Sequence, residues 1–382
     1  MEEETDQHDI HPSTSHKRPQ ILSKLITQSN YSRLWKIYER KSPISWIILF
    51  LSIFAMMTAF PASSLLSRLY YVDGAKSRWL LSWIAVAGWP LTAVFLFPFY
   101  FQKGISPTPL SWKLVISYAV LGFLSAADNL MYAWAYSYLP ASTSSLLASS
   151  SLAFTAVFAY FIVGKRLNAS TFNAIAIITA AAVIIGLDSD SDRPAGVSDG
   201  QYAAGYIWDI LGSALHGLIF ALAELLFIKL LGRKSFHVVL EQQVMVSLFG
   251  CIFTTIGVII NGDFTAMNSE ADAFKHGPVS YYMVLFWGAV TFQLGILGSV
   301  AVLYVTSTLL AGVLNAVRVP ITSLAAVVCF HDSMGGYKIL SLVLTIWGFG
   351  SYIYGSSSEV KIEHNSTDLT ANRKNLEEES VV

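Results

Sequence analysis

The sequence predicts an all-helical membrane protein, because it combines low charge, long apolar runs and no alternating strand pattern. Of its 382 residues, 54% are hydrophobic and only 13% are charged, which is about half the charged share of an average soluble domain. A membrane barrel would show ~10-residue segments of alternating polarity, whereas these runs are long and continuous. The composition argues against an ordinary soluble enzyme, and the net charge of −1 argues against a nucleic-acid binder.

Ten apolar runs follow the polar amino-terminal segment, and each is long enough to cross a bilayer as one helix, which takes about 20 residues. The third and fourth runs, and the eighth and ninth, have almost no polar linker between them. Each of these pairs is too long for a single span at ~1.5 Å of rise per residue, so each is divided in two, the first pair at Pro140. We expect spans near residues 44–69, 79–101, 112–137, 141–163, 169–187, 205–231, 236–260, 280–306, 308–330 and 336–355.

The basic residues near the predicted span ends indicate the orientation. With the amino terminus in the cytosol, twelve Lys and Arg residues fall on the cytosolic side and six on the opposite side. Cytosolic loops of membrane proteins carry an excess of positive charge, so both termini are expected in the cytosol. We expect the protein in the plasma membrane, with an endomembrane as the alternative.

An internal repeat divides the chain into two halves. Segment 145–154 (SLLASSSLAF) resembles segment 308–317 (TLLAGVLNAV), which gives five spans in each half. A repeat with an odd number of spans must insert its second copy upside down, and inverted repeats are typical of secondary transporters. The predicted organisation is a cytosolic, mostly disordered tail at 1–43, a first five-helix repeat at 44–187, an extracytosolic loop at 188–204, a second five-helix repeat at 205–355 and a cytosolic disordered tail at 356–382.

The third span holds the densest group of polar and aromatic residues, namely Asp128, Asn129, Tyr132 and Trp134. Ionisable residues are costly inside a membrane and usually face a cavity or a partner. An amide offers donors and acceptors on one planar edge, and an indole offers a stacking face, so this group suits a flat nitrogen heterocycle. A helix cap or a helix–helix contact is the alternative interpretation.

The sixth span carries Asp209, His216 and Glu224. Asp209 and His216 are seven residues apart and therefore share a helix face. Asp209 lies near the outer end of the span, where it could reach water, and His216 is either a proton shuttle or a hydrogen-bonded core residue. Glu224 lies deeper, with Lys229 as a possible ion-pair partner.

Further polar residues lie in the seventh, eighth and ninth spans. Glu241 is a candidate for proton coupling, because a carboxylate can bind and release a proton as its access to water alternates; an ordinary interfacial residue is the alternative. Gln293 lies in the eighth span. Asn315 and Arg318 lie one turn apart in the ninth, just before Pro320, which permits a kink. For Arg318 we favour a structural salt bridge to a carboxylate from another span.

Motifs of enzymes are missing from the sequence. There is no G-x-S-x-G, H-E-x-x-H or phosphate-binding loop. Cys251 and Cys329 both lie in apolar runs and indicate neither a disulfide nor a zinc site. We expect no enzymatic activity, no cofactor and no metal, and transport without an ATP site must draw on a gradient.

Several segments resemble the plant purine permeases, a family of the drug/metabolite transporter superfamily. The order of residues in D-N-x-x-Y-A-W-x-x-S-Y-L-P-A-S-T-S-S-L-L is the most distinctive part, and the resemblance covers roughly residues 44–355. The matching segments are FPASSLLSRLYY (60–71), AADNLMYAWAYSYLPASTSSLLASS (126–150), ALAELLF (221–227), VVLEQQVMVSLFG (238–250) and TSTLLAGVLNAVRVPITSLAAVV (306–328).

The resemblance implies ten spans in two inverted halves and proton-coupled uptake of adenine-like bases and cytokinins, which are N6-substituted adenines. As a substrate-binding hypothesis, Trp134 stacks on the purine ring, Asn129 and Gln293 read its edge, and Tyr132 and Asn315 make lesser contacts. The expected partners are this small molecule, protons and the lipid bilayer, without nucleic acid.

As a proton-coupling hypothesis, Glu241 carries the proton, followed by Glu224 and then Asp128. Arg318 departs from the leucine that the family pattern would place before the proline. Two other functions stay open, namely a transporter of a different nitrogenous metabolite or nucleotide sugar, and a membrane receptor that binds its ligand without moving it. A nucleotide sugar is anionic and would need several cations, whereas Arg318 is the only basic residue well inside a span.

Overall fold

Every regular element in the described part of the chain is a helix, as the sequence predicts. The computed structural model describes residues 43–101, 106–165, 167–187, 193–194, 196–232, 236–305 and 308–355, and no strand occurs within them. The predicted tails lie almost entirely outside these ranges, as do residues 188–192 of the predicted central loop. The all-helical class is therefore confirmed for the described residues.

The helices follow one another with short connections. They are α2 (Pro43–Val72), α3 (Arg78–Ala87), α4 (Trp89–Leu96), η1 (Phe97–Phe101), α5 (Trp112–Tyr138), α6 (Ala141–Ala148), α7 (Ser151–Phe158), η2 (Ala159–Val163), α8 (Ala169–Gly186), α9 (Asp199–Leu226), η3 (Phe227–Leu231), α10 (Phe236–Asn261), α11 (Asp263–Ala273), α12 (Gly277–Val305) and α13 (Thr308–Phe330). Residues 336–355 are also helical.

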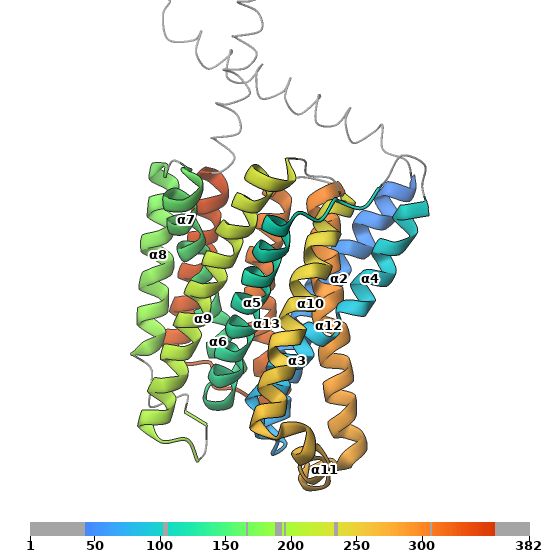
Figure 1. Cartoon of the computed structure of the whole chain (residues 1–382). Helices are drawn as coiled ribbons and strands as arrows, with labels where there is room; N and C mark the ends of the chain where they lie inside the picture. The colour runs from blue at the N-terminus through green and yellow to red at the C-terminus, as the bar shows by residue number, and fades with distance from the viewer. Residues whose placement is uncertain are drawn as a thin grey trace, which may run out of the picture. The chain divides into compact units, whose positions relative to one another are not determined.

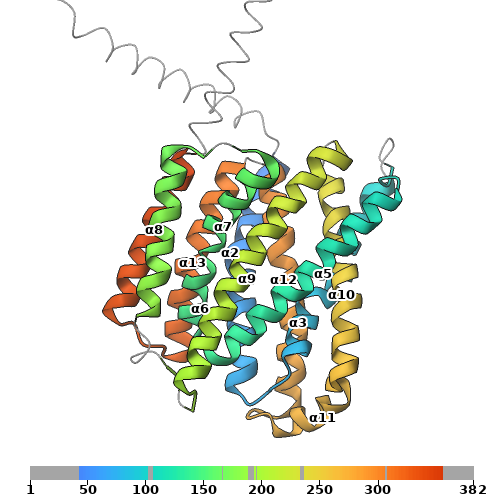
Figure 2. The ribbon, with the colours of Figure 1, turned by 60° about the vertical axis from the view of Figure 1, so that its left-hand side comes forward.

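Residues 49–382 form one compact unit, and of the preceding unit, 1–48, the structure describes only the first residues of α2. Within the larger unit the long helices stand side by side, and α11 lies across the end where α10 and α12 meet (Figures 1 and 2). Helix α5 packs against both α9 and α10, α7 packs against α9, and α13 packs against α6. This packing brings α5, α6, α9 and α13 together around the candidate site described below.

Within the described residues, eight helical segments are long and apolar enough to cross a membrane. They correspond to the first eight predicted spans. The ninth predicted span contributes a shorter apolar stretch, Val317–Phe330, and the tenth coincides with helical residues 336–355. A multi-pass membrane protein is confirmed, whereas the full number of ten spans stays a prediction.

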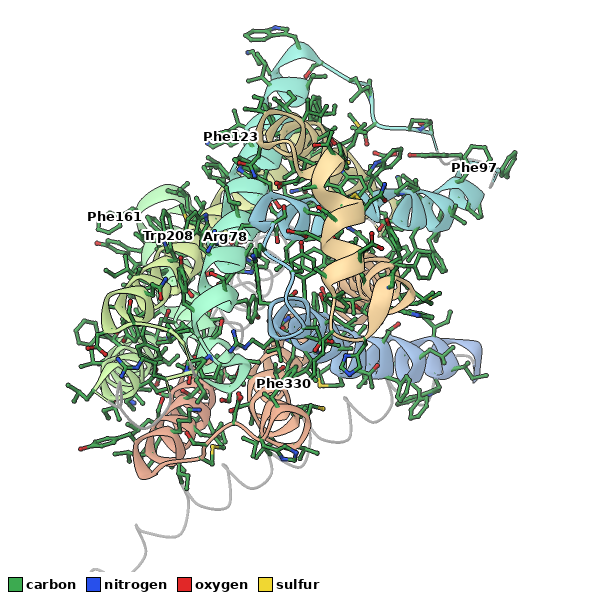
Figure 3. The ribbon with its side chains drawn as sticks, turned by 90° about the horizontal axis from the view of Figure 1, so that it is seen from below. Arg78, Phe97, Phe123, Phe161, Trp208 and Phe330 are labelled. Atoms are coloured by element: carbon green, nitrogen blue, oxygen red, sulfur yellow. The ribbon has the colours of Figure 1, made fainter. Side chains whose placement is uncertain are left out.

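The outer surface of the helices is apolar, as lipid contact requires. Phe97, Phe123 and Phe161 are all more than half exposed, and they project from the periphery of the helices in Figure 3. A soluble monomer rarely exposes large contiguous apolar patches. Because exposed aromatic and aliphatic side chains recur on the long helices, this surface fits the hydrocarbon of a bilayer better than water.

Polar caps define where several helices begin. The hydroxyl of Ser198 accepts a hydrogen bond from the backbone N–H of Gln201 at 3.3 Å, and the Gln201 side chain accepts one from the Ser198 N–H at 3.0 Å. This reciprocal capping box satisfies two free donors at the start of α9. Ser111 caps α5 with a single bond, which its hydroxyl accepts from Leu114 N at 3.3 Å.

The second predicted span is divided between α3 and α4 at Gly88, just before Pro90. A Cβ atom at position 88 would lie 2.6 Å from Cγ of Gln293 and 2.7 Å from the carbonyl oxygen of Ala289. Only glycine allows α12 to approach the α3–α4 junction this closely.

Two acidic residues of α11 accept hydrogen bonds from the neighbouring helices. One carboxylate oxygen of Glu270 accepts hydrogen bonds from the hydroxyls of Tyr70 at 3.1 Å and Tyr281 at 3.0 Å, and the other accepts one from Ser77 N at 3.1 Å. The Ser77 hydroxyl also donates to Asp263. These contacts join α2, the start of α3 and α12 through α11.

Candidate functional site

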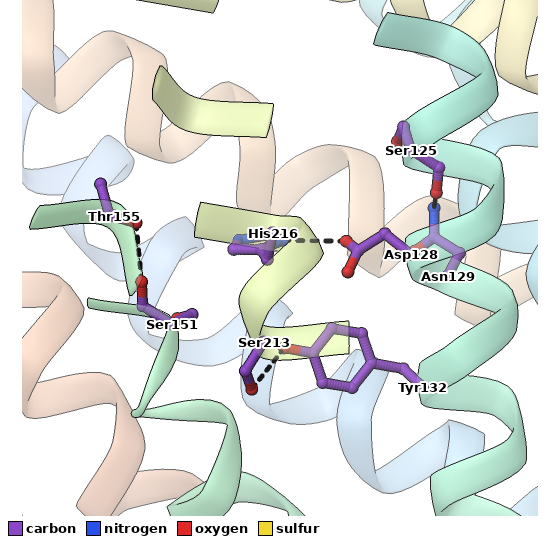
Figure 4. Close-up of polar contacts among 8 residues, drawn as sticks. All are labelled: Ser125, Asp128, Asn129, Tyr132, Ser151, Thr155, Ser213 and His216. Carbon is purple, nitrogen blue, oxygen red and sulfur yellow. Dashed lines mark hydrogen bonds and ion pairs between the residues drawn. The ribbon is translucent and has the colours of Figure 1, made fainter. Parts of the chain in front are cut away.

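The centre of the candidate site is a contact between Asp128 of α5 and His216 of α9. Nδ1 of His216 lies 2.9 Å from Oδ2 of Asp128, as Figure 4 shows. Asp128 is only 5% exposed, whereas the His216 side chain keeps 37% of its surface accessible. The other carboxylate oxygen of Asp128, Oδ1, is buried and has no hydrogen-bond partner among the described residues.

Tyr132 lies one turn along α5 from Asp128 and continues the polar cluster. Its hydroxyl is 3.2 Å from the hydroxyl of Ser213 on α9 (Figure 4), and its ring meets the His216 ring edge to face at 6.4 Å. Asn129 is close in sequence but turns back on its own helix, where its amide donates to the Ser125 carbonyl at 2.9 Å. In this conformation, Tyr132 therefore joins the cluster and Asn129 does not.

A second buried carboxylate, Asp209, lies two turns before His216 on α9. Its Oδ2 accepts a hydrogen bond from Ser144 of α6, and its Oδ1 is buried without a partner among the described residues. The suggestion that Asp209 reaches water at the end of the span is wrong, because its exposure is 0%. Ser213, which contacts Tyr132, lies one turn after Asp209 on α9, so Asp209 shares the face of α9 that the cluster occupies.

Arg318 of α13 contacts an aromatic ring of α2. Its guanidinium carbon lies 4.4 Å from the centre of the Phe60 ring on α2, and Tyr132 and Tyr136 are its electrostatic neighbours. The expected salt bridge to a carboxylate is not found, since none of the ion pairs among the described residues includes Arg318.

Trp134 lies near the end of α5, away from the Asp128–His216 pair. Its ring stacks on Trp208 at 5.8 Å between centroids, with 29° between the planes, and the guanidinium carbon of Arg78 lies 3.8 Å from its centroid. Figure 3 shows Arg78 and Trp208 close together in the view from below. The predicted stacking residue is thus engaged by two protein groups in this conformation.

Gln293 lies at the α3–α4 junction and is completely buried. Its Oε1 accepts from the Thr92 hydroxyl at 2.8 Å, and its Nε2 donates to the Ala85 carbonyl at 3.1 Å. These two bonds attach α12 to α3 and α4. Asn315 lies in α13, but its side chain is outside the described residues.

The two glutamates predicted to couple protons lie elsewhere. Glu241 is near the start of α10, where it accepts from the Tyr100 hydroxyl at 2.8 Å and from the backbone N–H of Thr108 at 3.3 Å. Glu224, near the end of α9, forms a 2.7 Å ion pair with Lys165. The partner is therefore Lys165, from the segment between η2 and α8, and not the suggested Lys229, and neither glutamate joins Asp128.

A cavity of about 300 Å³ opens beyond the end of α13. One residue of its wall contacts α5, because Nη1 of Arg68 donates to the backbone carbonyl of Tyr136 at 2.8 Å. The lining residues are Arg68, Val72, Pro140, Arg193, Pro194, Phe330, Asp332 and Ser333.

The fold and the cluster define a multi-pass membrane protein with polar groups buried among its helices. The family model described as purine nucleobase transmembrane transport matches residues 47–362, and the chain belongs to this family of purine permeases. The resemblance seen in the sequence is thereby confirmed, and the family points to a transporter rather than an enzyme.

Three relatives from Arabidopsis thaliana illustrate the similarity. Probable purine permease 5 is 67% identical over 321 residues, which cover 84% of this chain and 89% of that protein. Probable purine permease 11 is 35% identical, with 81% and 82% of the two chains covered. Purine permease 3 is 33% identical, with 76% and 85% covered.

Proposed function

We propose that this chain is a proton-coupled transporter of purine nucleobases and adenine-derived cytokinins that works by alternating access. The observation that carries the proposal is the contact between His216 and the buried Asp128. The second carboxylate oxygen of Asp128, Oδ1, has no partner among the described residues. An unpaired buried carboxylate oxygen costs free energy unless a proton or a donor reaches it. Purine bases supply such donors, as a ring N–H or an exocyclic amino group.

The same pair explains how a proton and a substrate could be coupled. Asp128 accepts a proton from the outer side, which removes its charge and weakens its bond to His216. The binding of a purine to Tyr132 and the neighbouring carboxylate Asp209 then favours the occluded state. Release on the inner side returns the proton to water, because a bare carboxylate re-forms the charge-assisted bond to His216.

The ranking of proton-coupling residues changes with this geometry. Glu241 has donors from Tyr100 and Thr108, and Glu224 is paired with Lys165. Asp128 is better placed than either, since it lies within α5, in contact with α9, and has one oxygen without a partner among the described residues. We keep Glu241 and Glu224 as secondary candidates whose loss would change rates or stability.

The remaining parts of the proposal concern membrane placement. We propose ten spans in two inverted five-helix repeats, with both termini in the cytosol and the protein in the plasma membrane. The eight membrane-crossing segments and the helical residues beyond α13 support the number of spans. The excess of basic residues on one side supports the orientation.

The test is uptake of labelled adenine and labelled trans-zeatin by yeast cells that lack their own purine uptake. We expect both compounds to accumulate above the external concentration, and accumulation to stop when a protonophore collapses the proton gradient. Unchanged accumulation after that treatment would overturn proton coupling while leaving purine transport in place. Uptake of adenine without zeatin would remove cytokinins from the proposal.

A further inference from the structure

Two glutamates of the second predicted repeat are bonded to the first repeat at one end of the molecule. Glu224 lies near the end of α9 and Glu241 near the start of α10, and Figures 1 and 2 show these two helix ends at the same end of the structure. Their side-chain partners among the described residues are Tyr100, Thr108 and Lys165. All three partners belong to the first predicted repeat, 44–187, so the contacts join the two repeats.

The contacts of Glu241 are the stronger of the two sets. Glu241 is only 7% exposed, and its Oε1 accepts a hydrogen bond from the Tyr100 hydroxyl at 2.8 Å. The Thr108 hydroxyl donates to Oε2, and the backbone N–H of Thr108 lies 3.3 Å from both oxygens. Hydrogen bonds to a charged acceptor that is shielded from water are stronger than neutral ones. Glu241 therefore holds η1 and the segment before α5 against α10.

The contact of Glu224 is an ion pair that water reaches. Nζ of Lys165 lies 2.7 Å from Oε1 and 2.8 Å from Oε2 of Glu224, which joins the segment after η2 to the end of α9. The Lys165 side chain is 53% exposed and the Glu224 side chain 25%. Because exposed ion pairs contribute little to stability, this pair assists the Glu241 contacts and does not replace them.

The opposite end of the structure carries the cavity described above. Its wall combines the end of α2 and the start of α6, from the first predicted repeat, with residues around the end of α13, from the second. Val72 lines this cavity and is 46% exposed. The two repeats are thus bonded to each other at one end and border a cavity at the other. Alternating access requires one end to open as the other closes.

Resting on the alternating access proposed above, we propose that Tyr100, Thr108 and Glu241 form a gate that closes the end of the transporter at which α9 ends and α10 begins, and that the Lys165–Glu224 pair assists it. When these contacts break, the two repeats separate at this end and come together around the cavity. In the proposed orientation this end faces the cytosol, so the gate controls the release of substrate into the cell.

The experiment follows the two ends with single cysteines in the purified full-length protein, after Cys251 and Cys329 are replaced by serine. Val238→Cys reports on the gate, because Val238 lies one turn before Glu241 and is 0% exposed. Val72→Cys reports on the cavity. The rate at which a hydrophilic maleimide labels each cysteine is measured in detergent, without a purine or a proton gradient.

We expect Glu241→Gln to raise the labelling rate of Val238→Cys at least about tenfold, as weakening of charge-assisted bonds predicts, and to lower the rate of Val72→Cys. Glu224→Gln should raise the first rate less than about threefold, because its ion pair is exposed. If Glu241→Gln does not fold, Thr108→Val removes one donor and leaves the carboxylate, with a rise of at least about threefold at Val238→Cys expected.

Gln243→Ala is the matched control, since Gln243 lies on the same helix and its amide donates to Ser247 of that helix at 3.0 Å. This variant should change neither labelling rate. Three results would overturn the inference. They are an unchanged rate at Val238→Cys in Glu241→Gln, an equal rise in Gln243→Ala, and a rise at Val238→Cys without a fall at Val72→Cys, which local unfolding would produce.

The outcome for the gate is separate from the outcome for purine transport. Labelling needs no substrate, so each of the three contrary results leaves purine uptake in yeast standing. Absence of purine uptake by the wild type would refute the proposed function, whereas the labelling rates would still show whether Glu241 holds this end of the molecule closed.

Discussion

Nδ1 of His216 lies 2.9 Å from Oδ2 of Asp128 across the interface of α5 and α9, while Oδ1 of the same carboxylate has no partner among the described residues. The contact joins two residues that are 88 positions apart in sequence. Because half of the carboxylate is satisfied by the protein and half is free, it can respond both to a proton and to a ligand donor. The first prediction concerns this asymmetry.

Asp128→Asn removes the proton-binding group and keeps the size of the side chain. We expect the variant to lose accumulation of adenine against its gradient, by at least about tenfold, because an amide cannot bind and release a proton in the transport cycle. Exchange of internal labelled adenine for external adenine should persist, since exchange needs no net proton movement. Uphill accumulation that survives in Asp128→Asn would remove Asp128 from proton coupling.

Glu241→Gln should behave differently from Asp128→Asn. Glu241 holds residues that precede α5 through Tyr100 and Thr108, and a glutamine can accept with only one oxygen. We expect a loss of about 1–3 kcal/mol in stability, seen as a lower unfolding temperature in detergent. Dependence of uptake on the proton gradient should remain. A Glu241→Gln protein that is fully stable but no longer coupled would restore Glu241 to the proton pathway.

The sequence predicted the helical class, the family and the presence of charged residues within spans, because these follow from composition and local order. The order in which it ranked the carboxylates for proton coupling stays a prediction, and the contacts found here lead us to propose a different order. Glu241 is bonded to Tyr100 of η1 and to Thr108, which precedes α5, and Glu224 is paired with Lys165, which lies between η2 and α8. Helical periodicity does not reveal such tertiary contacts. The burial of Asp209 also depends on tertiary packing. Its distance of seven residues from His216 indicated a shared face, but its burial depends on α6 packing against α9.

Gly88→Ala should disturb the packing of α12, through Gln293, against the α3–α4 junction. The added Cβ would lie 2.6 Å from Cγ of Gln293, closer than real contacts allow, so α12 or the glutamine must shift. We expect a loss of about 1–3 kcal/mol from overpacking, measured as reduced yield of folded protein and a lower unfolding temperature. Gly336→Ala is the control, because nothing lies within 4 Å of a Cβ at that position. Equal stability of the two variants would contradict this view of the junction.

Gln293→Ala separates a structural role from a substrate-reading role. Its amide satisfies the Thr92 hydroxyl and the Ala85 carbonyl, so truncation should destabilise the protein in the absence of any ligand. We expect the unfolding temperature to fall in adenine-free detergent and the rise produced by saturating adenine to stay the same size. Loss of that adenine-dependent rise with unchanged stability would show that Gln293 reads the purine edge, as the sequence first indicated.

The last prediction concerns Trp134, whose ring contacts both Arg78 and Trp208. If Trp134 stacks on the purine, one of these contacts must give way during the transport cycle. We expect Trp134→Ala to raise the KM for adenine at least about tenfold, since base–aromatic stacking contributes about 1–3 kcal/mol. Arg78→Gln removes the cation from the ring, a contact worth about 0.5–2 kcal/mol, and should lower stability while changing KM less than about twofold. Uptake kinetics and unfolding temperatures of both variants measure this directly. Equal effects of the two substitutions on KM would mean that Trp134 acts by holding Arg78 at the end of α5, and that the ring does not touch the substrate.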